Sequence, residues 1–97
     1  MFDPLLHQPI RTHIISIISS NEQGASFSQL LELTNATNGN LSSHLKTLED
    51  SGYIKVDKFF EGRRPKSIYT LTPLGLDSFL KYIDELSNFV SQKSSNK

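Results

Sequence analysis

The spacing of the apolar residues changes twice along this chain, and these changes restrict the possible folds more than any other feature. Up to Gly52, apolar residues recur at the three- and four-residue intervals of amphipathic helices. From Tyr53 to Leu71 they alternate with polar residues, as in strands, and after Thr72-Pro73 the helical spacing returns. We therefore predict a set of helices, then a β-hairpin, then a last helix.

Two helices are predicted in the first third of the chain. Pro9 suits the first position of a helix. One apolar face follows it, and Gly24 is a plausible stop; the face consists of Ile10, Ile14, Ile17 and Ile18. Ser26 and Gln29 have the spacing of a capping box, which begins a short second helix with Leu30, Leu31 and Leu33.

A third helix, the predicted recognition helix, is expected over about residues 38–51. Thr37 is its N-cap, and Gly52 suits the position just beyond its end. Its apolar face consists of Leu41, Leu45 and Leu48. The hairpin that follows spans about residues 53–71, with Glu61–Pro65 as its loop.

The last helix is expected over about residues 73–91, because Thr72 and Pro73 suit the N-cap and first helical positions. The order of elements predicts a mainly α fold with a β-hairpin (α+β): a winged helix-turn-helix with an added C-terminal dimerisation helix. We expect one domain over residues 1–91 and a frayed polar tail over residues 92–97.

Composition excludes several classes of function. There is no cysteine, hence no disulfide, thiolate metal site or cysteine nucleophile. His7, His13 and His44 lie on separate predicted elements without the spacing of metal ligands, so no metal site is expected. No Gly-rich phosphate loop or nucleophile elbow is present, so we expect no enzyme, no catalytic residues and no cofactor. Neither a secretory signal nor a long apolar run is present, which favours a cytoplasmic protein that is not bound to membranes.

The outward face of the third helix is a candidate DNA-reading surface. Opposite its leucines lie Gly39, Ser43, Lys46 and Asp50, with Ser42 and Thr47 at the edges. Small polar residues allow the backbone to approach a major groove and offer groups to base edges and phosphates. Taken alone, such a face is more often only a solvated surface. The hairpin behind it favours DNA.

The hairpin loop is the second candidate surface. Arg63 and Arg64 lie at its tip and Lys66 just behind them, where they could straddle a phosphate backbone or enter a narrow minor groove. The alternative is that these charges protect a sheet edge from aggregation.

The last helix carries a heptad pattern that predicts a two-fold dimer. A helix that packs only on its own domain could show the same pattern, but its length favours a partner helix. Leu5 in the N-terminal segment is expected to join this interface, whose residues on the helix are Leu76, Phe79, Ile83, Leu86 and Val90. Such a dimer would hold two recognition helices about one DNA turn apart, on a palindromic operator.

Several motifs together resemble the small winged-helix transcriptional regulators related to the MarR and ArsR families. They are the Leu-x-x-His-Leu-x-x-Leu-Glu-x-x-Gly-Tyr pattern from Leu41 to Tyr53, the Gly-Arg-Arg-Pro sequence at 62–65, and Tyr-x-Leu-Thr from Tyr69. The resemblance covers about residues 2–80. It implies a dimer that binds double-stranded DNA sequence-specifically, mostly as a repressor. It assigns base reading to residues of the recognition helix, namely Asn38, Asn40, Ser42, Ser43 and Lys46. It assigns DNA contact to residues of the wing, namely Arg63, Arg64 and Lys66.

The charge balance keeps two other hypotheses open. The chain has 10 basic and 10 acidic residues, whereas DNA-binding domains are often strongly basic. A winged-helix protein-interaction module without DNA binding would suit this neutrality. Ligand sensing at the dimer interface is compatible with either hypothesis, and no residue pattern identifies a small-molecule effector.

Overall fold

The helices begin where their capping residues predict. In a computed structural model of the protein, which describes residues 2–95 and side chains up to residue 92, α1 spans Pro9–Ser19, with Pro9 in its first turn and Gln8 as its N-cap. The N-terminal part of α1 is tied down because the Gln8 side chain accepts a hydrogen bond from the Arg11 amide. Its fully buried residues are Ile14, Ile15 and Ile18, while Ile10 and Ile17 are half-buried.

The helix-turn-helix consists of α2 (Phe27–Thr34) and α3 (Asn38–Asp50). The predicted capping box is present, since Ser26 and Gln29 hydrogen-bond each other's backbone. Asn35 adopts the left-handed conformation at φ 57°, which turns the chain sharply, and Thr37 then caps α3 through the Asn40 amide. The three predicted leucines of α3 are buried against α1 and α2.

The end of α3 sets the start of the wing. Gly52 lies at φ +82°, and its amide binds the Glu49 carbonyl while the Tyr53 amide binds the Leu48 carbonyl. This is a Schellman motif, in which a glycine in the left-handed region allows the chain to reverse. The predicted role of Gly52 is confirmed.

The sheet has three antiparallel strands in the order β1-β3-β2, one more strand than the sequence predicted. β2 (Ile54–Glu61) and β3 (Arg64–Leu71) form the expected hairpin, and β1 (Ala25–Ser26) pairs with Ile68 and Tyr69. Gly24, expected to end the first helix, lies instead at the entry to β1 with φ +85°. A Cβ there would lie 2.3 Å from the Tyr69 carbonyl oxygen, so only glycine fits beside β3.

The hairpin turn is tighter than predicted. Glu61 pairs with Arg64, so only Gly62 and Arg63 form the turn, and Pro65 belongs to β3. Gly62 has φ +65°, as a two-residue turn with glycine at its first central position requires. All residues from Asp57 to Pro65 are exposed, and the hairpin from Asp57 to Lys66 projects from the core as the wing.

The last helix, α4, spans Pro73–Ser95 and is longer than the expected 73–91. Most of the predicted tail therefore belongs to α4, and residues 96–97 lie outside the described residues. Thr72 caps α4 by accepting a hydrogen bond from the Gly75 amide and also donates to the Gly52 carbonyl. No helix in residues 2–95 has the length and apolar character needed to cross a membrane.

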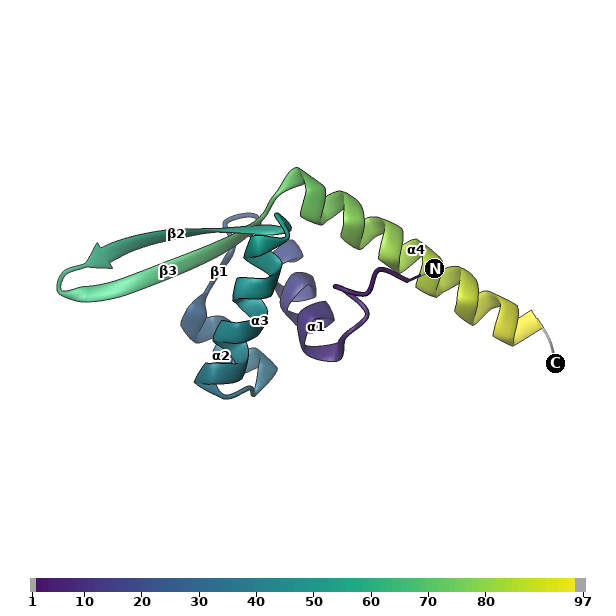
Figure 1. Ribbon diagram of the computed structural model, residues 1–97, viewed down its shortest axis with the longest axis horizontal. Coiled ribbons are helices and arrows are strands. Elements are labelled where there is room, and N and C mark those ends of the chain that lie inside the picture. Colours follow the sequence, from purple (N-terminus) through teal and green to yellow (C-terminus); the bar gives the residue numbers. More distant parts are fainter. Residues whose placement is uncertain (1, 96–97) are drawn as a thin grey trace.

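Two arms extend in opposite directions from the helical core, as Figure 1 shows: the wing on one side and α4 on the other. The molecule measures 58 × 26 × 21 Å as a result. The core between the arms combines leucines and isoleucines of α1, α2 and α3 with Ile54 and Tyr69 of the sheet. This arrangement is a winged helix, as the sequence predicted.

Candidate nucleic-acid interface

The polar face of α3 is exposed along its whole length. All of the recognition-helix residues predicted to contact DNA are accessible, namely Asn38, Asn40, Ser42, Ser43 and Lys46. The leucines on the opposite side of α3 are buried, so the core holds this face outward. Because Asn38 is the first residue of α3, the two asparagines lie at the positive end of the helix dipole, where phosphates are attracted.

Lys46 is the cation of this face, and it is paired with a carboxylate. Its Nζ lies 3.1 Å from Asp50 Oδ1, one helical turn away, and both side chains are mostly exposed. Such a surface pair contributes little to stability. Lys46 can therefore leave Asp50 for a stronger anion at small cost.

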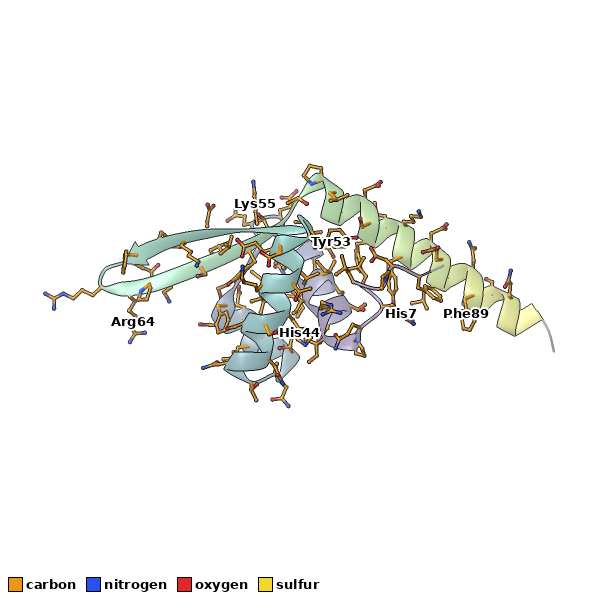
Figure 2. All side chains as sticks on the ribbon, viewed as in Figure 1. His7, His44, Tyr53, Lys55, Arg64 and Phe89 are labelled. Atoms are coloured by element: carbon orange, nitrogen blue, oxygen red, sulfur yellow. The ribbon has the colours of Figure 1, made fainter. Side chains whose placement is uncertain are left out.

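The cations of the wing are divided between its tip and a cleft. Arg63 occupies the turn and is exposed, and Figure 2 shows Arg64 near the outer end of the wing. Lys66 is half-buried, because it lines a cleft of about 430 Å³ together with Arg64. The other wall of the cleft is the start of α2, from Ser26 to Ser28. The fold thus brings two predicted wing residues beside the helix-turn-helix.

His44 connects α3 to the N-terminal part of the chain. Arg11 Nη1 lies 3.3 Å from His44 Nδ1, and Arg11 Nε donates to the Leu5 carbonyl at 2.7 Å. Burial and the nearby Arg11 guanidinium lower the pKa of His44. Nothing in the spacing of the sequence pointed to Arg11 as the partner of His44.

The predicted dimer stripe of α4 is divided between two faces. Phe79 and Leu86 are half-buried against the protein's own core, whereas Leu76, Ile83 and Val90 are exposed. Tyr82, which the heptad pattern did not select, is buried beside Phe79 and Leu86. One apolar face of α4 therefore completes the domain, and the adjacent one is left open.

The N-terminal segment covers part of α4. The Phe2 ring stacks on the His7 ring with centroids 4.7 Å apart, and it meets Tyr82 and Phe89 edge-on. His7 Nδ1 lies 3.0 Å from the Tyr82 hydroxyl, and Figure 2 shows His7 and Phe89 at the α4 end of the molecule. Leu5 is half-buried in this segment, while Leu6 is fully buried.

Asp3 anchors this segment to Tyr53, the residue just before β2. The Tyr53 hydroxyl donates to Asp3 Oδ2 at 2.5 Å, and the Leu5 amide donates to Asp3 Oδ1. Burial, followed by the hydrogen bond to Asp3, raises the pKa of Tyr53. Burial also raises the pKa of Tyr69 within the sheet.

A cavity of about 610 Å³ lies between α1 and α4 and is lined by His7, His13 and Tyr82 among others. Within the described residues, no group of three histidine, aspartate or glutamate side chains could hold a metal ion.

Comparison with known proteins agrees with this geometry. The model of the family described as winged helix DNA-binding domain matches residues 10–90. An uncharacterised protein of Methanocaldococcus jannaschii is 33% identical over 82 residues, which cover 84% of this chain and 88% of that protein.

Solved structures show the same fold. A transcriptional regulator homologue from Pyrococcus horikoshii OT3 superposes with a TM-score of 0.82 and 27% identity, over 91% of this chain and 86% of that one. MarR superposes with a TM-score of 0.70 and 22% identity, over 92% of this chain and 66% of that one. MepR, a transcription regulator of the Staphylococcus aureus multidrug efflux pump MepA, superposes with a TM-score of 0.74 and 16% identity, over 91% of this chain and 64% of that one.

The similarity in fold to MarR-like regulators is thus confirmed, while a relation to the ArsR family stays a prediction. The matched family consists of DNA-binding domains rather than enzymes. In helix-turn-helix domains the second helix of the motif lies in the major groove, and α3, with its exposed polar face, is that helix here. The chain belongs to the winged-helix DNA-binding domain family and has the fold of MarR-like transcriptional regulators.

Proposed function

We propose that this protein is a homodimer that binds a palindromic DNA operator and acts as a transcriptional repressor. In this proposal α3 enters the major groove, the wing contacts the backbone or the adjacent minor groove, and α4 joins two copies. The observation that carries the proposal is the exposure of the small polar face of α3 in a fold that also holds wing cations beside the start of α2.

The α3 face suits base reading because of its side chains and its size. Asn38 and Asn40 carry amides, which pair with adenine in the major groove, and Ser42 and Ser43 carry hydroxyls, which pair with several bases. Gly39 has no other group within 4 Å of the place where a Cβ would lie, so the first turn of α3 is narrow and open. Lys46 lies farther along the helix, where it suits a phosphate.

The wing offsets the neutral net charge of the chain. It holds four cations (Lys58, Arg63, Arg64 and Lys66) against two acidic residues (Asp57 and Glu61), a local excess of two. Phosphate contacts by such cations release counterions and attract the protein to DNA of any sequence. The neutrality of the whole chain therefore does not favour the protein-interaction module over DNA binding.

The dimer is supported by the open face of α4. Successive helical residues turn by about 100°, which places Leu76, Leu80, Ile83 and Val90 within about 40° of one line. Each of the four is between 42% and 57% exposed. A partner helix from a second copy would bury this stripe and would relate the two α3 helices by a two-fold axis.

The proposed repressor role follows from the occupation of the operator by the dimer. A dimer that covers a stretch of duplex excludes other proteins from it, without any further catalytic or activating surface. The sign of regulation is tested by transcription from a template that carries the operator.

Selection of bound duplexes from a random DNA pool tests the proposal. We expect an enriched palindrome whose half-sites lie about one helical turn (~34–36 Å) apart. The Ser43→Glu variant, which places a carboxylate against the groove, should fold normally by circular dichroism and enrich nothing. Wild-type protein that enriches no duplex would contradict DNA binding, and enrichment of a single unpaired half-site would contradict the dimer.

A further inference from the structure

The wing exposes two phenylalanines that phosphate binding alone does not require. Phe60 is 74% exposed and Phe59 is 45% exposed, both on β2, which is an edge strand of the sheet. Edge strands usually carry charges that prevent association, and exposed aromatic rings there favour it. A partner that covers at least one of these rings would explain why they are present.

The two rings lie on opposite faces of the hairpin. Residues alternate along a strand, so Phe60 shares the face of Ile54 and Val56, which pack on the helical core. Phe60 pairs across the hairpin with Pro65, whereas Phe59 pairs with Lys66 on the other face. Phe60 therefore continues the core-facing side of the sheet beyond the core itself, and Phe59 does not.

The charge around Phe60 indicates what covers it. Lys58 lies on the same face of β2, and Arg63 follows in the turn. On the opposite face, beside Phe59, the cations Arg64 and Lys66 are balanced by Asp57 and Glu61. A second copy of this chain would bring a like-charged wing against these cations and is disfavoured. A polyanion with apolar surface between its charges is favoured, and duplex DNA has both phosphates and sugar and base edges.

The length of the wing fits this partner. Val56 is the last half-buried residue of β2, and Phe60 lies four residues farther out, about 13 Å at the usual rise of a strand. The major groove is about 12 Å wide. A wing of this length is therefore long enough to extend beyond a major groove occupied by α3.

We propose that Phe60 is an apolar DNA contact, which places its ring in the minor groove beside the half-site while Arg63 and Arg64 hold the flanking phosphates. This inference rests on the proposed function and names a contact within it. Apolar side chains in a minor groove pack against sugars or wedge between base steps. The guanine amino group projects into that groove, so the ring favours pairs that lack it.

The experiment compares Phe60→Ala with Phe59→Ala on a duplex selected by the wild-type protein. Both side chains are exposed, so both variants should fold, which thermal unfolding checks. We expect Phe60→Ala to weaken binding about tenfold with no change in the salt slope, because the ring releases no counterions. Phe59→Ala, the matched control, should stay within about twofold of wild type.

A second measurement tests the groove itself. Inosine-cytosine pairs lack the minor-groove amino group of guanine-cytosine pairs, but both pairs present the same groups in the major groove. In the flank beneath the wing, the wild-type protein should bind the inosine duplex about tenfold more tightly than the guanine duplex. Phe60→Ala should lose this preference, and Phe59→Ala should keep it.

The outcomes separate this inference from the proposed function. If the wild-type protein selects no duplex, the proposed function fails and this inference fails with it. If it selects one and Phe60→Ala binds as wild type does, or Phe59→Ala loses as much as Phe60→Ala, only the Phe60 contact is overturned. A Phe60→Ala variant with normal DNA affinity and altered sedimentation of the free protein would assign the ring to a protein contact and overturn the inference as well.

Discussion

The wing and α4 both leave the core as arms, and both expose large apolar side chains, but they arrange them differently. On α4 four exposed residues share one stripe that contains no charged residue, from Leu76 to Val90. On the wing the two phenylalanines lie on opposite faces among four cations. Exposure alone would not distinguish the two arms.

The difference indicates which partner each arm suits. An uncharged helical stripe is self-complementary, so a second copy can cover it across a two-fold axis. A hairpin with cations at its tip repels its own copy and attracts a polyanion. The two arms therefore divide the proposed function between assembly and DNA contact.

The largest effect is expected at the centre of the α4 stripe. Ile83→Asp places a carboxylate in the proposed seam, which should cost about 3–5 kcal/mol of association free energy and leave monomers. Asn88→Asp is the matched control, since it adds the same charge to an exposed position about 140° away from Ile83 on the helix. Sedimentation velocity distinguishes the two. A dimer that survives Ile83→Asp would place the seam elsewhere.

Two glycines, one in each arm, differ in the space that is available for an added Cβ. A Cβ on Gly75, in the first turn of α4, would lie 1.9 Å from the Tyr53 carbonyl oxygen, whereas a Cβ on Gly62 in the wing turn meets nothing within 4 Å. Gly75→Ala should therefore lower the free energy of unfolding by about 1–3 kcal/mol through overpacking. Gly62→Ala should cost about 1 kcal/mol, from its positive φ alone. Urea denaturation measures both, and a milder effect at Gly75 than at Gly62 would contradict the close packing of α4.

The charge of the wing is tested by the salt dependence of DNA binding. Arg63→Ala combined with Arg64→Ala should weaken binding to all sequences and reduce the slope of log affinity against log salt by about 2. Lys81→Ala, which removes an exposed cation from α4, is the control and should leave the slope unchanged. A salt slope that does not change in the double variant would show that the wing arginines do not contact the DNA phosphates.

The smallest effect concerns pH. Because the pKa of His44 is lowered from 6.5 in the folded protein, the unfolded chain binds a proton first as the pH falls. The contribution of His44 to stability should therefore be constant above pH 6.5 and decrease below it, until His44 is also protonated in the folded state. His44→Gln should remove this decrease and His13→Gln, on the exposed side of α1, should retain it. The midpoint of urea unfolding at several pH values measures the difference.

Local signals were sufficient to predict most of the fold. The capping residues Ser26, Thr37 and Thr72 act within three positions of themselves, and Gly52 acts through its own φ, so their roles are visible in the sequence. β1 was missed because two residues carry no period, and its pairing with β3 depends on tertiary structure.

The arms show the limit of a pattern. The heptad spacing of α4 selects Phe79 and Leu86 together with Ile83, but it cannot tell a face that packs on its own core from one that is left open. The Arg11–His44 contact and the pairing of Phe60 with Pro65 depend in the same way on packing and register. These properties are fixed only when the chain has folded.

The number of chains on one selected duplex tests the division of roles most directly. Light scattering at saturation should find two chains per palindromic duplex for the wild-type protein, and the Arg63→Ala, Arg64→Ala variant should remain a dimer while binding more weakly. One chain per duplex at saturation, or a free dimer that the wing substitutions dissociate, would contradict the assignment of assembly to α4 and of DNA contact to α3 and the wing.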